Sequence, residues 1–162
     1  KVYGRVKAIQ LNAICEIALR MIKPSNYKTM KIESQKDIAN ICIREFYYEK
    51  KEISRIYFLN VKNIVIQVLD MTTSATSYVN MSIKEIIAKA VELRADKMIL
   101  VHNHPSGNTT PSKQDIKFTD ELFNAGKLLD IDLVDHIIVS KTGYTSVYTY
   151  LKEEISKIKE NN

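Results

Sequence analysis

Two histidines follow a short apolar segment, and their spacing suits a metal site. His102 and His104 come directly after Met98–Val101, a run typical of a buried strand. Side chains two positions apart in a strand point to the same side, so both imidazoles would converge on one point. Asp115 follows His104 across a loop with proline and glycine, which can turn the chain back. Two histidines and one carboxylate leave the fourth tetrahedral position of a zinc ion open to water, as in catalytic sites.

A catalytic zinc also needs a general base, and several carboxylates are candidates. Glu52 opens a predicted strand, and the start of a strand can face the metal from across the sheet. Spacing alone does not choose it over Glu45, Glu49 or Glu85. Ser112, in the loop before the next predicted helix, could hydrogen-bond a tetrahedral oxyanion.

The elements that must position these residues alternate between helices and strands. Ser82 with Glu85, and Ser112 with Asp115, have the spacing of capping boxes that begin helices. The expected elements are an amphipathic helix over 8–22, a helix from Ser34 or Asp37 to about Tyr48, a β-hairpin with strands at 53–59 and 64–69, a helix from Ser82, a strand at 98–101, a helix after Pro111, strands near 133–139 and 144–148, and a final charged helix or tail.

Apolar residues at helical spacing indicate which helix faces are buried. The helix that begins at Ser82 is expected to bury Ile83, Ile86, Ile87, Ala90 and Val91. The helix after Pro111 is expected to continue its apolar face through Phe118, Leu122, Ala125 and Leu129. This alternation, with one antiparallel hairpin, predicts an α/β domain with a mixed sheet.

Length and composition favour one domain with a short appendage. The chain has 162 residues, of which 45% are hydrophobic and 27% charged, so it can bury a core. We place a helical region and polar linker at 1–33, the main domain at 34–150 and a charged tail at 151–162. No apolar run is long enough to cross a bilayer, and no signal peptide is recognisable. Because the first residue is Lys1 and not Met, we expect a fragment of a longer protein.

The cysteines and the charge distribution indicate the cellular location and the kinds of partner. Two cysteines without a CxxC pair argue against a disulfide framework and favour a reducing, cytoplasmic location. Residues 1–36 hold eight Lys/Arg and two Asp/Glu, a net +6, whereas residues 37–162 carry a net −1. A basic segment can meet nucleic acid or an acidic partner, although a solvated basic helix is the simpler interpretation. No membrane partner is expected.

The spacing of the site residues resembles that of a known motif. His102-Asn103-His104, followed after seven residues by Ser112 and after two more by Asp115, resembles the JAMM motif. The run His102–Gly107 resembles the corresponding segment in the RadC family of bacterial JAB-domain proteins. Three further segments resemble that family as well: Pro111-Ser112, Asp135–Val139 with Ser146, and Lys51-Glu52-Ile53. The resemblance covers about 36–150, and residues 4–20 are similar to the last helix of the helix-hairpin-helix region that precedes this domain in the family.

The resemblance implies a JAB1/MPN-like (cytidine-deaminase-like) mixed sheet flanked by helices, with a short N-terminal helical appendage. It implies zinc held by His102, His104 and Asp115. Glu52 would be the general base and acid, and Ser112 would stabilise the oxyanion. Members of the wider JAMM group cleave amide or isopeptide bonds. The expected protein is therefore a zinc metallopeptidase, isopeptidase or amidase that acts on a peptide or protein.

Other interpretations stay open. RadC proteins carry a DNA-repair label, so the domain could be an interaction scaffold in a repair or recombination protein that meets DNA through residues 1–36. It could also be a pure interaction module, as a monomer or a homodimer, in which the metal stabilises the fold. His136, inside an apolar strand, is expected to be a satisfied structural histidine or a partner behind a metal ligand. Asn103 is expected to face away from the metal.

Overall fold

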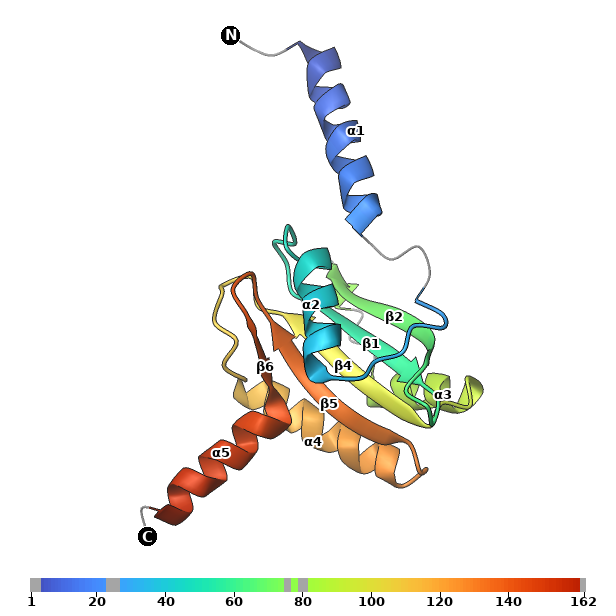
Figure 1. The fold of residues 1–162 in the computed structure, drawn as a ribbon, viewed down its shortest axis with the longest axis vertical. Coiled ribbons are helices and arrows are strands. Elements are labelled where there is room, and N and C mark those ends of the chain that lie inside the picture. Colours follow the sequence, from blue (N-terminus) through green and yellow to red (C-terminus); the bar gives the residue numbers. More distant parts are fainter. Residues whose placement is uncertain (1–3, 23–26, 75–76, 79–81, 161–162) are drawn as a thin grey trace.

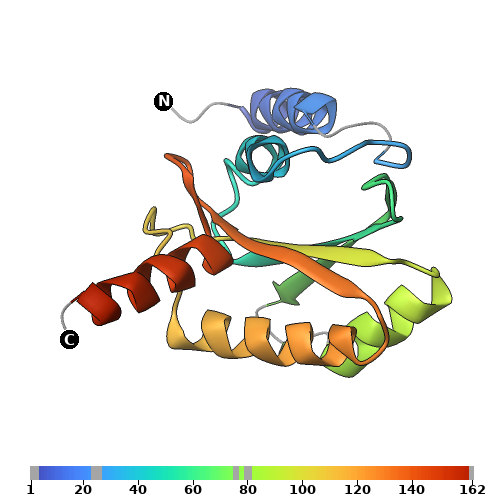
Figure 2. The same ribbon diagram turned by 60° about the horizontal axis from the view of Figure 1, so that its bottom comes forward.

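The protein is arranged in layers around one twisted sheet (Figure 1). The structure is a computed structural model that describes residues 4–22, 27–74, 77–78 and 82–160. Turned on its side, the molecule shows α2 on one face of the sheet and α3 and α4 on the other (Figure 2). The helix α1 extends away from the sheet (Figure 1). The elements in chain order are α1 Arg5–Ile22, α2 Gln35–Glu45, β1 Ile53–Leu59, β2 Val65–Ser74, β3 Ser77–Tyr78, α3 Ile83–Glu92, β4 Lys97–Asn103, α4 Lys113–Lys127, β5 Asp132–Val139, β6 Tyr144–Ser146 and α5 Val147–Glu160.

The sheet is mixed, with the strand order β3-β2-β1-β4-β5-β6. Among the described strands, the pair β4 and β5 alone is parallel, and every other neighbouring pair is antiparallel. The α/β class, the mixed sheet flanked by helices and the antiparallel hairpin β1–β2 are therefore confirmed. The parallel pair matters for the site, because the ends of β4 and β5 meet at one edge of the sheet.

Each face of the sheet packs into its own apolar core. Tyr57, Val101 and Ile137 belong to the core beneath α2, whereas Ile56 and Leu100 belong to the core beneath α3 and α4. A bulge in β5 shifts which side chains face each side of the sheet. Met98 pairs with Leu133 and Ile99 pairs with Asp135, so one residue of β5 between them has no partner in β4. The extra residue turns the following part of β5 so that His136 faces the α4 side and Asp135 the α2 side.

Both predicted capping boxes are present. The Ser82 hydroxyl accepts from the Glu85 amide and the Glu85 carboxylate accepts from the Ser82 amide, and Ser112 and Asp115 exchange the same pair of bonds. The predicted burial of Val91 is wrong, because its side chain is 53% exposed. Five residues of helix place it about 140° around the axis from Ile86, at the edge of the buried stripe.

Two further sequence predictions need correction at element ends. Leu129 lies beyond α4 and is exposed, because the helix ends at Lys127 and the chain turns there. The strand expected near 144–148 ends at Ser146, and α5 begins at Val147. The Ser146 hydroxyl accepts from the Thr149 amide, which is how a serine begins a helix.

The segment before α2 packs on the domain. Ile32 is buried, and its amide donates to the Asn63 carbonyl, while Val65 donates to the Met30 carbonyl. The polar stretch 23–33 is thus bound to the β1–β2 hairpin over its last residues, and its residues 23–26 lie outside the described part. Where the domain begins stays a prediction.

A buried ion network lies between β1 and α2. Arg55 is 2% exposed and pairs with the carboxylates of Glu45 and Asp70. The Tyr27 hydroxyl donates to Glu45 at 2.6 Å and accepts from Arg55 at 3.0 Å. The network contains its own cation and its own anions.

None of the helices in the described ranges combines the length and the hydropathy of a membrane span.

Candidate metal centre

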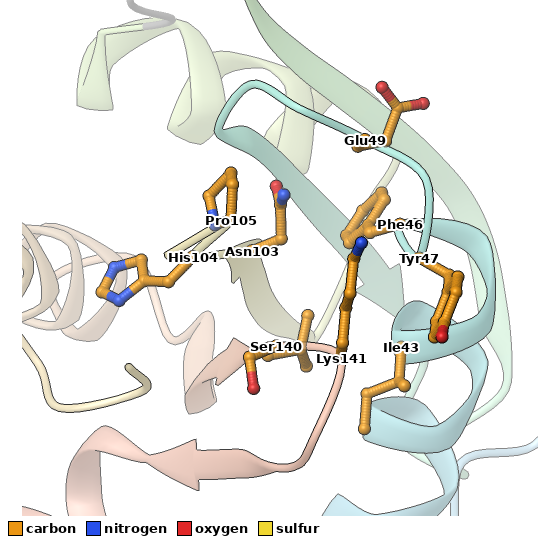
Figure 3. Close-up of a pocket in the computed structure, with 10 residues that line it drawn as sticks. Ile43, Phe46, Tyr47, Glu49, Asn103, His104, Pro105, Ser140 and Lys141 are labelled. Carbon is orange, nitrogen blue, oxygen red and sulfur yellow. The ribbon is translucent and has the colours of Figure 1, made fainter. Parts of the chain in front are cut away.

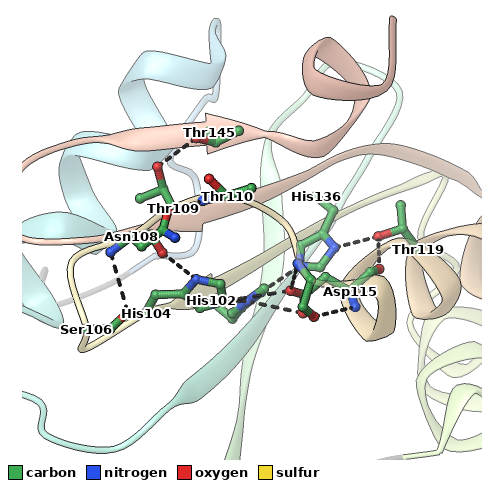
Figure 4. Close-up of polar contacts among 11 residues, drawn as sticks. His102, His104, Ser106, Asn108, Thr109, Thr110, Asp115, Thr119, His136 and Thr145 are labelled. Atoms are coloured by element: carbon green, nitrogen blue, oxygen red, sulfur yellow. Dashed lines mark hydrogen bonds and ion pairs between the residues drawn. The ribbon is translucent and has the colours of Figure 1, made fainter. Parts of the chain in front are cut away.

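The structure brings the three predicted ligands together at the end of β4. His102 lies in β4, His104 directly follows the strand, and Asp115 is in the first turn of α4. The Nε2 atoms of the two histidines are 2.8 Å apart. One carboxylate oxygen of Asp115 lies 3.4 Å from His102 Nε2, and the other lies 3.7 Å from His104 Nε2. Figure 4 shows these side chains directed at one another.

The separations suit one small cation. Ligand atoms at 2.0–2.1 Å from a tetrahedral zinc are about 3.3 Å from each other. The three measured separations, 2.8, 3.4 and 3.7 Å, lie around that value. The set of two imidazoles and one carboxylate also matches the ligand types that zinc prefers.

The hydrogen bond of the His104 ring also favours a cation at this site. Its Nδ1 lies 2.6 Å from the carbonyl oxygen of Asn108, which can only accept a hydrogen bond. Nδ1 must therefore carry the proton, and a neutral His104 presents a bare lone pair at Nε2. That lone pair and the Asp115 carboxylate are both acceptors in close approach, an arrangement that a cation between them stabilises.

The capping box of α4 orients the carboxylate. The Ser112 amide donates to Asp115 Oδ2 at 2.7 Å, and the Asp115 amide donates to the Ser112 hydroxyl at 3.1 Å. Asp115 Oδ1 is the oxygen nearer to His102. Ser112 thus lies beside the ligand set, with its hydroxyl proton still to donate.

The loop from β4 to α4 is built to return to the histidines. The Gly107 amide donates to the His104 carbonyl, and Gly107 has φ +90°, a conformation that glycine adopts without strain. This tight turn brings the Asn108 carbonyl back to the His104 ring. Thr109 and Thr145 share a 2.7 Å hydroxyl–hydroxyl hydrogen bond, which ties the loop to β6.

Burial keeps the inner imidazoles neutral. Burial lowers the pKa of His102 to about 4, and this outweighs Asp115, which raises it; His104 lowers it further. Burial also lowers the pKa of His136, with smaller contributions from His102 and His104 in the same direction. Neutral imidazoles at physiological pH are what a metal requires of histidine ligands.

The strand register, continued beyond the last paired residues, predicts that Glu52 lies on the same side of the sheet as the ligands. Ser54 pairs with His102 on the antiparallel strands β1 and β4. The same register continued by two residues sets position 52 opposite His104, and directly opposed residues point to the same face. The catalytic role of Glu52 stays a prediction.

Asn103 holds the segment that carries Glu52. Its side-chain oxygen accepts from the Ile53 amide at 2.7 Å, and its side-chain nitrogen donates to the Lys51 carbonyl at 3.1 Å. These bonds clasp the backbone on both sides of Glu52. Asn103 therefore lies on the face of β4 away from the metal ligands, where it anchors the neighbouring strand.

The alternative acids have other surroundings. Glu45 is buried in the Arg55 network, and Glu85 is used by the capping box of α3. Glu49 lines a small cavity with Asn103 and His104, but its carboxylate points away from the His104 ring (Figure 3). That cavity has a volume of about 10 Å³, about the minimum for one water molecule, so it is too small for a substrate group.

Sequence reasoning did not find Thr119. Its hydroxyl contacts the Asp115 carbonyl and the His136 ring, each at 2.6 Å, and His136 in turn contacts His102 at 2.7 Å. Thr119 lies one helical turn after Asp115, which is the only signal in the sequence that places it near the site. The part of β5 that carries His136 faces this way because of the bulge.

Comparison of the sequence with known proteins identifies its family. A family model described as the RadC-like JAB domain matches residues 32–154, which contain every ligand candidate. The chain belongs to the RadC family. A UPF0758 protein of Clostridium botulinum (strain Hall) is 36% identical over 144 residues, which cover 89% of this chain and 63% of that protein.

A UPF0758 protein of Enterococcus faecalis (strain V583) is 38% identical over 147 residues, covering 89% of this chain and 62% of the relative. The chain thus spans slightly less than two thirds of the length of these curated relatives. The names of these RadC-family relatives state no activity, so the chemistry of this JAB domain rests on its own residues.

Proposed function

We propose that this RadC-like JAB domain is a zinc-dependent hydrolase of amide bonds, acting as a metallopeptidase, isopeptidase or amidase. The observation that carries the proposal is the cluster of His102, His104 and Asp115, whose ligand atoms face one another at the spacing of a tetrahedral ion. With three protein ligands, the site has the composition of a catalytic zinc and not of a closed structural one.

In this proposal His102, His104 and Asp115 hold the ion. When bound, zinc supplies Lewis-acid chemistry: it lowers the pKa of a water molecule and polarises a carbonyl group. The cluster lies at the edge of the sheet, where the side chains of His104 and Asp115 are partly exposed and can admit a substrate.

Glu52 is proposed to take the proton from the attacking water and to pass it to the departing amine. Asn103 supports this role because it fixes the backbone on both sides of Glu52. Ser112 is proposed to donate its hydroxyl proton to the oxyanion that forms on the substrate carbonyl. Its oxygen already accepts from the Asp115 amide, which limits the directions in which the hydroxyl can point.

The test is hydrolysis of a panel of peptide and isopeptide substrates by the zinc-loaded protein. Glu52→Gln should lower the rate about 10²–10⁴-fold, because it removes the general base and keeps the shape. Glu49→Gln is the matched control, since Glu49 is a nearby acid that points away from the ligands, and it should keep the wild-type rate. Unchanged activity of Glu52→Gln would remove Glu52 from the mechanism.

A zinc-loaded wild type that cleaves nothing on the panel would favour a scaffold in which the metal is a staple. Chelation would then lower thermal stability without any activity to lose.

A DNA-associated role is the second candidate, and α1 is the feature that favours it. Residues 1–36 carry a net +6, and the apolar side chains Val6, Ile9 and Ile14 of α1 are exposed in this chain. The basic segment would contact phosphates. DNA binding that weakens steeply with salt, and weakens further when residues 1–22 with four of the eight Lys/Arg are removed, would support it. The truncation stops at residue 22 because Ile32 is part of the domain core. Absence of binding at low salt would count against it.

A further inference from the structure

A line of hydrogen bonds runs from the backbone of one metal-ligand candidate to the ring of another. It connects the Asp115 carbonyl, the Thr119 hydroxyl, His136 and His102, with successive distances of 2.6, 2.6 and 2.7 Å. Thr119 and His136 are each 2% exposed, and His102 is 5% exposed. Figure 4 shows the line entering the cluster from α4, behind His102.

The direction of each bond follows from the first acceptor. A carbonyl oxygen only accepts, so the Thr119 hydroxyl spends its one proton on the Asp115 carbonyl. The Thr119 oxygen must then accept from His136 Nδ1, since two acceptors at 2.6 Å would repel. A neutral His136 with its proton on Nδ1 has a lone pair on Nε2, which accepts from His102 Nδ1.

The end of the line is the ligand atom. A neutral His102 with its proton on Nδ1 has a bare Nε2, and that atom faces His104 and Asp115. We propose that Thr119 and His136 are positioning residues that hold His102 in the tautomer whose Nε2 is free to bind a metal ion. They touch neither the ion nor a substrate, and act only through His102.

The arrangement also couples two ligands. Asp115 binds through its carboxylate, while its backbone carbonyl begins the line that sets the tautomer of His102. The first turn of α4 therefore controls both ligands, whereas His104 is set separately by the Asn108 carbonyl. Two independent devices lead to the same result, a bare Nε2 on each histidine. These two Nε2 atoms are 2.8 Å apart, a close approach of two acceptors that a cation between them stabilises.

Loss of the Thr119 hydroxyl should reverse the line. In Thr119→Val, His136 has no acceptor for a proton on Nδ1 and gains by moving it to Nε2. His136 then donates to His102 Nδ1, and the His102 proton moves to Nε2, the atom that must bind the metal. Thr119→Ser keeps the hydroxyl and is the matched control.

The test has two readouts that need no substrate. The first is a long-range ¹H–¹⁵N NMR spectrum of the imidazoles in the metal-free protein, which reports which nitrogen carries each proton. We expect His102 protonated at Nδ1 in the wild type and in Thr119→Ser, and protonated at Nε2 in Thr119→Val. A wild-type His102 that carries its proton on Nε2 would overturn the proposal, and this measurement stands even if Thr119→Val does not fold.

The second readout is zinc affinity, measured by competition with a chromophoric chelator. Thr119→Val should bind zinc about 10–100-fold more weakly than wild type, because partners behind a ligand tune metal affinity to this extent. Thr119→Ser keeps the hydroxyl and should bind zinc with nearly the wild-type affinity. Equal affinity of the folded Thr119→Val and Thr119→Ser variants would also overturn the proposal.

The zinc-affinity measurement rests on the proposed function, whereas the NMR measurement of the His102 tautomer does not. A wild type that binds zinc but cleaves no substrate would defeat the hydrolase and leave the positioning role intact. A wild type that binds no zinc would defeat the metal site, while the NMR spectrum would still decide the tautomer.

Discussion

The two faces of the sheet each bury a polar cluster, and the clusters balance their charge in different ways. Beneath α2, Arg55 is paired with Glu45 and Asp70, so a cation and its anions come from the chain itself. On the α4 side, His104 and Asp115 present acceptors to each other, and the neighbouring His102 is kept neutral by burial. The first cluster balances its charge with side chains of the chain itself, whereas we propose that a cation balances the second.

The difference separates a structural site from a binding site. A buried ion pair that satisfies itself has no need of a ligand, and its partners stabilise or destabilise only the fold. A cluster of acceptors at metal-ligand spacing is stabilised by an external cation, so its occupancy and the stability of the fold are linked. The comparison predicts that changes in the first cluster act on folding alone and changes in the second act on zinc.

The largest expected effect on folding is in the self-balanced cluster. Arg55→Met leaves Glu45 buried without its cation, which should lower the free energy of unfolding by about 3–5 kcal/mol. Chemical denaturation measures this. The double variant with Glu45→Met should recover much of the loss, and the zinc affinity of both variants should equal that of wild type. Lys31→Met, which breaks the exposed pair with Glu33, is the control and should change stability by at most about 1 kcal/mol.

Low pH should destabilise the metal-free protein through the cluster of His102, His104 and Asp115. Because the pKa of His102 is lowered to about 4 in the folded state, its contribution to stability is full above the unfolded value of 6.5 and is lost as pH falls towards 4. The loss is on the order of 3 kcal/mol.

His136, whose pKa is also lowered, acts in the same direction. Asp135, whose pKa is raised by burial, acts in the opposite direction at the acid end. Denaturation between pH 7 and 4 with a chelator present measures the slope, and His102→Gln should reduce it. A wild-type stability that does not change over this range would show that His102 is not held neutral.

Zinc should stabilise the wild type by an amount set by its affinity. A free concentration one hundred times the dissociation constant adds about 2.7 kcal/mol to the free energy of unfolding. Asp115→Asn weakens the ligand set and should remove this gain, whereas Arg55→Met, although less stable, should keep it. If zinc stabilised Asp115→Asn as much as wild type, the ion would be bound elsewhere.

The smallest expected effects compare the two capping boxes. Ser112→Ala and Ser82→Ala should each lower stability by about 1 kcal/mol, because each removes the side chain that begins a helix. Only Ser112→Ala should also weaken zinc binding, because only its box contains a ligand. Equal zinc affinity in the two variants would mean that the box of α4 is structural alone.

Local patterns predicted most of this fold. The hairpin, both capping boxes and the spacing of His102, His104 and Asp115 depend on neighbouring residues and could be seen in the sequence. The position of α5 could not, because the strand and the helix meet at Ser146 within a run rich in Tyr, Thr and Val, residue types that favour strands.

The contacts behind the ligands were also beyond sequence reasoning. The bonds of Thr119 and His136 depend on which face of β5 turns towards α4, and a one-residue bulge in β5 decides this. The clasp of Asn103 around Glu52 depends on the register between β1 and β4. Both are long-range features that follow from the pairing of strands far apart in sequence.

The central claim is that His102, His104 and Asp115 bind a metal ion, and metal content tests it most directly. Protein purified without chelator should be compared with His104→Ala by elemental analysis, with zinc then added back to each. The account predicts about one zinc per chain in the wild type, as expected of a single site with this ligand set, and loss of that zinc in the variant. A wild type that contains no metal and binds none when zinc is supplied would contradict the account.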